Sequence, residues 1–197
     1  MNVVLASASE IRSSLLSNAG VHHEAVPARV DEEALKAGLL AEGASHRDIA
    51  DALAEAKARK VSGKVAGAIV IGCDQVLSHE GRLISKPETR DIARDRLHAL
   101  SGTRHKLVTA AVAYRDGEPL WRHANDVSLT MRALSETYID DYIARNWESV
   151  RHSVGGYKLE EEGLRLFRSI EGDYFSALGL PMIALLSWLC DSGNLAA

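Results

Sequence analysis

The chain has 197 residues, of which 46% are hydrophobic and 25% charged, so it belongs with ordinary globular proteins rather than disordered or fibrous ones. Its 23 Lys and Arg against 27 Asp and Glu give a formal net charge of −4, and no basic block forms the footprint of a binder of polymeric nucleic acid. The two cysteines, Cys73 and Cys190, exclude a disulfide framework and a thiolate zinc site, and we expect both to be buried reduced thiols.

We expect one domain, residues 1–197, because a chain of this length buries a core that needs no disulfide or structural metal. It begins Met1-Asn2-Val3 with no cationic leader, and its longest apolar stretch, 178–190, contains Pro181. That stretch is shorter than the roughly 20 residues that span a bilayer. We therefore expect a cytoplasmic protein with no membrane partner.

The first predicted elements are a strand over 3–6, a tight loop over 7–9, and a helix that ends near Gly20. Ser9 is the expected N-cap, and the free backbone N–H groups near 7–12 predict an anion site. Arg12 lies in the first helical turn, where a cation opposes the macrodipole unless an anion binds there. This conflict favours a functional role for Arg12, although Ser7 and Ser9 by themselves are typical simple caps.

A strand near 22–26 leads into a region that we predict to be an acidic loop, 31–33, and then into a helix from Ser45 or Arg47 to Gly63. Lys57 lies near the C-terminal end of that helix. The apolar run 68–71 predicts a strand buried on both faces, which delivers Gly72-Cys73-Asp74-Gln75 at its C-terminal side.

Asp74 follows this buried strand, where a carboxylate must be hydrogen-bonded, paired or bound to a metal. Its position fits a turn-capping residue as well as it fits a catalytic one. Lys86 precedes Pro87 and is held extended; taken alone, it is more often a solvated lysine.

The second half predicts a hairpin at 79–81, a helix over 89–100, two long strands (107–114 and 126–132) joined near Asp116-Gly117, and a helix from Ser135 to Arg145. A loop at 155–157, a strand over 164–170 and a last helix from Leu180-Pro181 follow. The mixture predicts an α/β sheet protein. Glu160-Glu161-Glu162 by itself is typical of a charged surface run.

Several common sites are excluded by their missing motifs. The histidines have no metal-ligand spacing, no Gly-x-Ser-x-Gly elbow is present, and no Walker phosphate loop occurs. Any phosphate site must therefore be assembled differently.

Seven short motifs nevertheless occur in a particular order. They are Leu5-Ala6-Ser7-Ala8-Ser9-Glu10-Ile11-Arg12, Val30-Asp31-Glu32, Gly72-Cys73-Asp74-Gln75, Ser85-Lys86-Pro87, Leu100-Ser101-Gly102-Thr103-Arg104-His105, Gly155-Gly156-Tyr157 and Gly179-Leu180-Pro181. In this order, from Leu5 to Leu189, the sequence resembles the Maf family of nucleoside triphosphate pyrophosphatases.

This resemblance implies an α/β fold similar to that of inosine triphosphate pyrophosphatases: an elongated mixed sheet flanked by helices, with a cleft between two lobes. The implied reaction is hydrolysis of a nucleoside triphosphate to the monophosphate and pyrophosphate with a divalent metal, usually Mg²⁺. Asp74 matches the family's proton acceptor and could also help to hold the metal, with Glu32. The substrate-binding positions are matched by Ser7, Ser9, Arg12, Lys57 and Lys86. A homodimer is expected by analogy with the family.

Three residues are candidates for base specificity. Gln75 and Glu160 resemble the branch associated with 7-methyl-GTP, and a carboxylate such as Glu160 can accept hydrogen bonds from the N1–H and N2–H₂ edge of guanine. Ile11 stands where that branch often carries Trp, and Ser13 replaces the second Arg of the family's Arg-Arg pair.

Two alternative functions stay open at this stage. One is a nucleotide-binding regulator of cell division and septum formation with little turnover, which the family's history suggests. The other is a phosphatase that releases orthophosphate rather than pyrophosphate.

Overall fold

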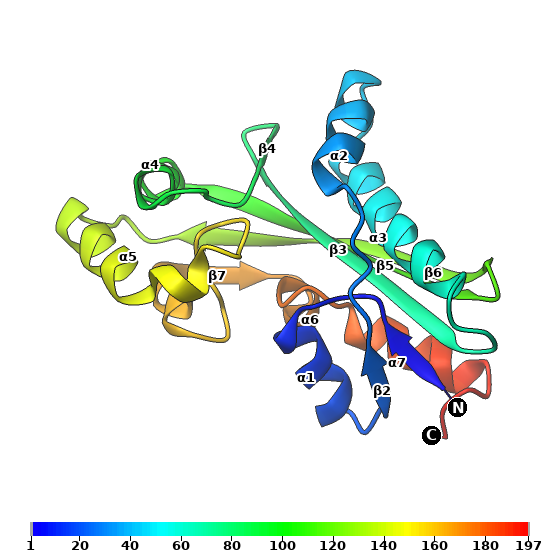
Figure 1. The fold of residues 1–197 in the computed structure, drawn as a ribbon. Coiled ribbons are helices and arrows are strands. Elements are labelled where there is room, and N and C mark those ends of the chain that lie inside the picture. Colours follow the sequence, from blue (N-terminus) through cyan, green and yellow to red (C-terminus); the bar gives the residue numbers. More distant parts are fainter. Residues whose placement is uncertain (1, 197) are drawn as a thin grey trace. The chain divides into compact units, whose positions relative to one another are not determined.

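The structure, a computed structural model, describes residues 2–196 (Figure 1). Its strands are β1 (Val3–Leu5), β2 (His23–Ala25), β3 (Ile69–His79), β4 (Arg82–Ile84), β5 (Arg104–Arg115), β6 (Glu118–Met131) and β7 (Phe167–Glu171). Its helices are α1 (Glu10–Asn18), α2 (Glu32–Ala41), α3 (His46–Ser62), α4 (Arg90–Leu100), α5 (Glu136–Val150), the 3₁₀ helix η1 (Glu162–Leu166), α6 (Tyr174–Ala177) and α7 (Met182–Asp191). No helix in this described part is long and apolar enough to cross a membrane.

The strands form a mixed seven-stranded sheet in the order β2-β1-β3-β5-β6-β7, with β4 paired to β3. Strand β1 is parallel to both of its neighbours, so that Val3 pairs with His23 and with Ile69. The β3–β4 and β6–β7 pairs are antiparallel. Parallel strands require long crossovers, and helices supply them here. The expected α/β fold, a mixed sheet flanked by helices, is confirmed.

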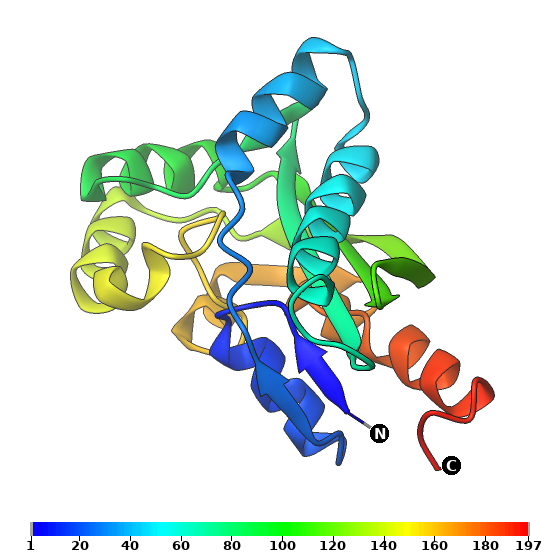
Figure 2. The ribbon, with the colours of Figure 1, turned by 45° about the vertical axis from the view of Figure 1, so that its right-hand side comes forward.

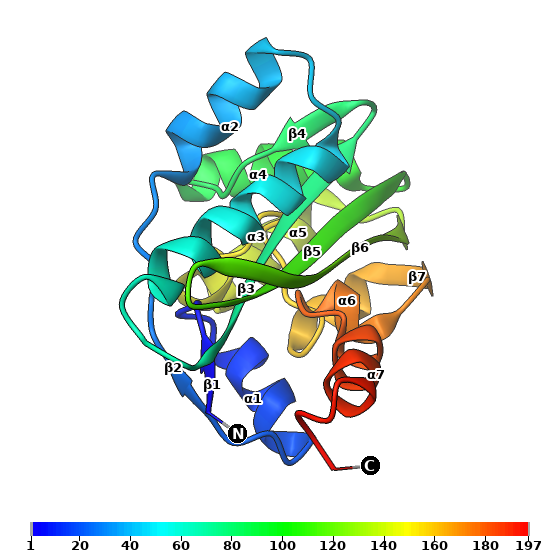
Figure 3. The same cartoon turned by 90° about the vertical axis from the view of Figure 1, so that its right-hand side faces the viewer.

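The chain divides into two compact units. The first comprises the residues up to Gln75, Val108–Asn125 and the residues from Gly179 onwards. In this unit α1 lies beside β2, as Figure 2 shows. Helix α7, drawn in red in Figure 3, also belongs to this unit. The ring of Trp188 on α7 stacks on the ring of Trp121 on β6, with the ring centroids 5.4 Å apart. One cluster of its buried residues consists of Val4, Ala6, Ala28, Val61, Ala68 and Val70.

The second unit comprises Val76–Leu107 and Asp126–Leu178. Helices α4 and α5 lie side by side in it (Figures 1 and 2). Both helices bury apolar residues in the core of this unit, among them Leu97, Leu100, Ile139 and Tyr142. The cleft expected between two lobes stays a prediction.

Most of the local signals act as the sequence predicts. At four predicted helix starts the side chain of the N-cap residue accepts a hydrogen bond from the first turn: Ser9, Ser45, Thr89 and Ser135. The two hairpin turns place a non-glycine residue and a following glycine at positive φ, at Glu80-Gly81 and Asp116-Gly117. Two successive positive φ values match the right-handed twist of paired strands.

Two predictions about the first half are wrong. The segment 31–33 is the start of α2 rather than a loop: the Asp31 carboxylate accepts from the backbone N–H of Ala34 at 3.0 Å, and acidic side chains stabilise a helix N-terminus. The run of three acidic residues at this position is typical of a solvated loop, and no residue of α2 is fully buried. Strand β3 also continues well past Ile71, as far as His79.

Smaller differences occur elsewhere. The stretch predicted as one strand over 164–170 is divided between η1 and β7, and α6 was not predicted. Cys73 is buried, as expected, but Cys190 is only half-buried.

Candidate active site

Asp74 lies inside β3, on the face that α3 covers. A Cβ atom at Gly72 would lie 2.1 Å from the carbonyl oxygen of Ala54 and 2.6 Å from the backbone nitrogen of Ala58, both on α3. Only glycine permits this close approach of helix and strand. Residues i and i+2 of a strand share a face, so the side chain of Asp74 also points towards α3, where Lys57 meets it.

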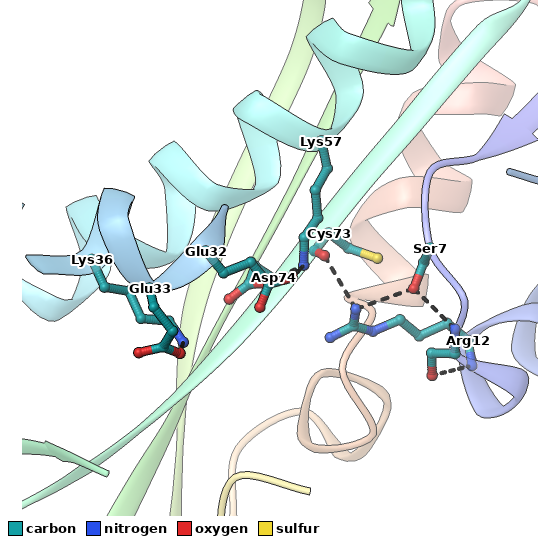
Figure 4. A network of polar contacts seen from close by, with 9 residues as sticks. Ser7, Arg12, Glu32, Glu33, Lys36, Lys57, Cys73 and Asp74 are labelled. Atoms are coloured by element: carbon teal, nitrogen blue, oxygen red, sulfur yellow. Dashed lines mark hydrogen bonds and ion pairs between the residues drawn. The ribbon is translucent and has the colours of Figure 1, made fainter. Parts of the chain in front are cut away.

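Lys57 holds two carboxylates together (Figure 4). Its Nζ lies 2.5 Å from Oδ1 of Asp74 and 2.7 Å from Oε1 of Glu32. The side chains of Lys57 and Asp74 are 11% and 7% exposed, and that of Glu32 is 29% exposed. A carboxylate and an ammonium are stable at such burial only when each compensates the other.

The charge state of Lys57 follows from these neighbours. Burial lowers its pKa, but the charges of Asp74 and Glu32, with the Asp74 hydrogen bond, outweigh burial and the opposing charge of Arg12, so the pKa is raised above its ordinary value. Lys57 is therefore a cation at neutral pH, and it is unsuited to act as a general base.

The loop before α1 holds Arg12 against the same strand. Ser7 Oγ accepts from the backbone N–H of Ser9 at 3.2 Å and from Nη1 of Arg12 at 3.5 Å. Nη1 of Arg12 also donates to the carbonyl oxygen of Cys73 at 3.1 Å, as Figure 4 shows. The guanidinium is thus tied to the residue that directly precedes Asp74. Ser7, Ser9, Arg12, Lys57, Asp74 and Glu32 all belong to the first unit.

Gly179, in another part of the same unit, leaves room for the guanidinium of Arg12. A Cβ atom at Gly179 would lie 2.8 Å from Nε and 3.0 Å from Nη2 of Arg12. The φ of Gly179 is +98°, in the left-handed region that strains other residues. Glycine is therefore favoured at this position for two independent reasons. A side chain would displace the guanidinium of Arg12, and any other residue would be strained at this φ.

Gly179→Ala is expected to displace Arg12 and so weaken binding of an anionic substrate, raising the KM for the substrate about tenfold, the effect of one weakened charge-assisted hydrogen bond. Gly193→Ala is the matched control, because Gly193 has a φ of +69° and no atom within 4 Å of its added Cβ. Steady-state kinetics of both variants check this. If Gly179→Ala and Gly193→Ala had the same KM, the proposed effect of Gly179 on Arg12 would be contradicted.

Three further side chains of the first unit, Cys73, Gln75 and Ile11, lie next to these residues in the sequence. Burial raises the pKa of the Cys73 thiol, although Arg12 and Lys57 oppose that rise; the thiol therefore stays protonated and is a poor nucleophile. Gln75 donates from Nε2 to Oγ1 of Thr109 at 2.9 Å, and Ile11 is half-buried on α1.

The remaining sequence candidates belong to the second unit. Lys86 is exposed in the loop between β4 and α4. Glu160 is exposed in the turn before η1. Within residues 2–196 neither side chain has a hydrogen-bond or ion-pair partner, so both are available to a ligand.

The donor set around Lys57 fits Mg²⁺ completed by substrate. Among the described residues no three His, Cys, Asp or Glu side chains cluster as a metal site. Mg²⁺, however, commonly takes one or two protein carboxylates and fills its other positions with phosphate oxygens and water. Glu32 and Asp74 are two such carboxylates, drawn together by one ammonium.

The tertiary structure adds residues to which the sequence assigned no role. Gly72 and Gly179 each begin one of the seven motifs, but their role depends on neighbours far along the chain. A glycine inside an apolar strand is a signal of close backbone approach, and it could have marked Gly72. No local signal connects Gly179 with Arg12.

Comparison with known proteins gives consistent results. Residues 2–192 match the family model described as Maf-like protein. A nucleoside triphosphate pyrophosphatase of Roseobacter denitrificans is 58% identical over 98% of this chain and 97% of its own. A 7-methyl-GTP pyrophosphatase of Rhizobium meliloti is 48% identical over 99% of this chain and 98% of its own.

Among solved structures, a nucleoside-triphosphatase / dITP/XTP pyrophosphatase from Mycobacterium abscessus is similar over 68% of this chain and 76% of its own. Its sequence identity is 18% and its TM-score 0.38, and at that score the likeness bears on neither the site nor its function. The match to the family model and the two relatives above are sufficient: the chain belongs to the Maf family.

Proposed function

We propose that this protein is a hydrolase that cleaves a nucleoside triphosphate to the monophosphate and pyrophosphate. The observation that carries the proposal is the buried ion-pair cluster of Lys57 with Asp74 and Glu32, next to an arginine tied to the residue before Asp74. Relatives at 57–58% identity are named nucleoside triphosphate pyrophosphatase, which supports the same reaction.

Asp74 is the proposed catalytic residue. Water that attacks the α-phosphorus must lose a proton, and an ionised carboxylate can accept it. The same carboxylate could instead hold a metal that activates the water. Either role requires a carboxylate at Asp74 that is held in place, and the ion pair with Lys57 holds it.

The cations of the site are proposed to bind the polyphosphate. A triphosphate carries about four negative charges, and transfer of a phosphoryl group depends on positive charge and hydrogen-bond donors placed around it. Arg12 and Lys57 of the first unit supply the charge, and Lys86 is a further proposed substrate-binding residue. Ser7, Ser9 and the free backbone N–H groups at the start of α1 supply donors.

Mg²⁺ is the proposed cofactor. The formal charges of Arg12, Lys57, Glu32 and Asp74 cancel, so this cluster alone gives no net attraction for a tetra-anion. If bound, Mg²⁺ would neutralise charge on the triphosphate and polarise its oxygens. Glu32 and Asp74 would hold it.

A guanine-type base is the proposed preference, with 7-methyl-GTP as one candidate. Glu160 can accept from both donors on the guanine edge, and a pyrimidine offers no equivalent pair. Gln75 and Ile11 are the other proposed specificity residues. Relatives at 48% identity are named 7-methyl-GTP pyrophosphatase, which supports this preference. A cytoplasmic location and a homodimer are further proposals.

A panel of canonical and modified nucleoside triphosphates, incubated with Mg²⁺, tests the proposed function. Chromatography should find the monophosphate, and a coupled assay should find pyrophosphate in equal amount. Orthophosphate released without added pyrophosphatase would indicate the phosphatase alternative. Tight binding with little turnover would indicate the regulatory alternative.

A further inference from the structure

The three consecutive glutamates at 160–162 are not equivalent. Glu161 accepts from Oγ of Ser149 at 2.7 Å and from Nζ of Lys158 at 3.1 Å. Glu162 accepts from Nη2 of Arg145 and from Nδ2 of Asn146, each at 2.8 Å. Among residues 2–196 only the first of the three, the exposed Glu160, has no partner of this kind. Two of the three carboxylates, those of Glu161 and Glu162, therefore have structural partners, and the carboxylate of Glu160 is available to bind a ligand.

The turn that carries Glu160 is anchored by Tyr157. This side chain is 3% exposed, and its ring packs edge-on against Phe167, with centroids 4.7 Å apart. Its hydroxyl lies 2.7 Å from Nε2 of His105 on β5. The backbone of the turn is closed at the same place, because Oγ of Ser153 donates to the carbonyl oxygen of Tyr157.

The glycines around the turn are required by this arrangement. A Cβ atom at Gly155 would lie 2.2 Å from the Tyr157 ring, and one at Gly163 would lie 2.4 Å from the carbonyl oxygen of Lys158. Gly156 has a φ of +68°. Gly155 of the Gly-Gly-Tyr motif thus leaves room for the Tyr157 ring, and Gly163 leaves room for the backbone of Lys158. The turn from Tyr157 to Gly163 is therefore tightly packed at its start and at its end.

His105 is buried and neutral, and its side chain is hydrogen-bonded to Tyr157. It is 2% exposed, and burial, with a smaller contribution from His79, lowers its pKa to about 4. The imidazole is neutral at physiological pH, and its Nδ1 has no hydrogen-bond partner within the described residues. The bond to Tyr157 is therefore its one polar anchor in this part of the chain.

We propose that His105 and Tyr157 are positioning residues for base recognition: their hydrogen bond fixes the turn that presents Glu160 to the base. This inference rests on the proposed function. Holding a carboxylate in one geometry strengthens the hydrogen bonds it makes, because less freedom is lost when the base binds. The pair acts through Glu160, and neither residue is among those proposed to bind the phosphates or to activate the water.

The test compares two buried tyrosines of the second unit. Tyr157→Phe removes the hydroxyl that His105 holds. Tyr142→Phe is the matched control, since Tyr142 is 1% exposed and its hydroxyl has no hydrogen-bond partner within residues 2–196. Each variant, with Glu160→Ala and the Tyr157→Phe/Glu160→Ala double variant, is assayed with GTP and with UTP in excess Mg²⁺. Inorganic tripolyphosphate serves as an inhibitor that has no base.

Tyr157→Phe is expected to lower the GTP-to-UTP ratio of kcat/KM at least about fivefold, through the KM for GTP, within the range of one lost hydrogen bond. Tyr142→Phe should leave the ratio unchanged. The double variant should lose no more selectivity than Glu160→Ala, because both changes act on one interaction. Inhibition by tripolyphosphate should stay unchanged in every variant.

Three results would overturn the inference while leaving the hydrolase reaction intact. They are an unchanged GTP-to-UTP ratio in Tyr157→Phe, an equal fall in kcat for both nucleotides, and a loss in the double variant that equals the product of the single losses. A wild-type protein that releases pyrophosphate from both nucleotides without preference would overturn base recognition by Glu160 as well. Absence of pyrophosphate would overturn the proposed function itself.

Discussion

Asp74→Asn is expected to lower kcat by at least about 100-fold, the usual size of the loss when a general base is removed. Asparagine keeps the shape of aspartate but has neither its basicity nor its charge. The fold should survive the change, because Lys57 keeps its second carboxylate, Glu32, at 2.7 Å. Steady-state release of pyrophosphate in excess Mg²⁺ measures the effect.

Asp95→Asn is the control for this substitution, since Asp95 is exposed on α4, and it should turn over like the wild type. Turnover of Asp74→Asn close to that of the wild type would refute the assignment of the catalytic residue.

Lys57→Met is expected to reduce the free energy of unfolding by about 3–5 kcal/mol at pH 7, as when one partner of a buried ion pair is removed. The variant leaves two carboxylates facing each other, and that of Asp74 is only 7% exposed. Urea unfolding at pH 7 measures this loss.

The wild type should show a complementary alkaline effect. The pKa of folded Lys57 is raised above the ordinary value of 10.5. Its stabilising contribution is therefore complete below about pH 10.5 and is lost as the pH rises through the folded-state pKa. Lys57→Met should lack this part of the alkaline loss.

Lys36→Met is the matched control, because Lys36 pairs with a carboxylate, Glu33, that is 74% exposed. Figure 4 shows this pair beside the buried cluster. A pair with one partner in solvent contributes at most about 1 kcal/mol. Equal losses in Lys57→Met and Lys36→Met would show that the buried cluster has no special energetic role.

How much of the candidate site could be predicted from the sequence depends on the range of each interaction. The Ser9 cap and the start of α1 follow from residues within a few positions of each other, and both were predicted. Asp74 was identified as important, but its setting was not. The sequence predicted that the strand ends after Ile71, because glycine and aspartate are typical of turns. The observed strand β3 has 11 residues and continues to His79.

Sequence alone determined the kinds of residue that this protein brings to the chemistry, the order of its motifs and the starts of most of its α helices, because caps, turns and apolar periodicity are local. Only the tertiary structure decided which groups meet. The α3–β3 approach at Gly72 pairs Lys57 with Asp74, Gly179 supports Arg12, and His105 anchors Tyr157. Contacts between residues 17, 167 and 52 positions apart in the chain depend on packing, which no local pattern specifies.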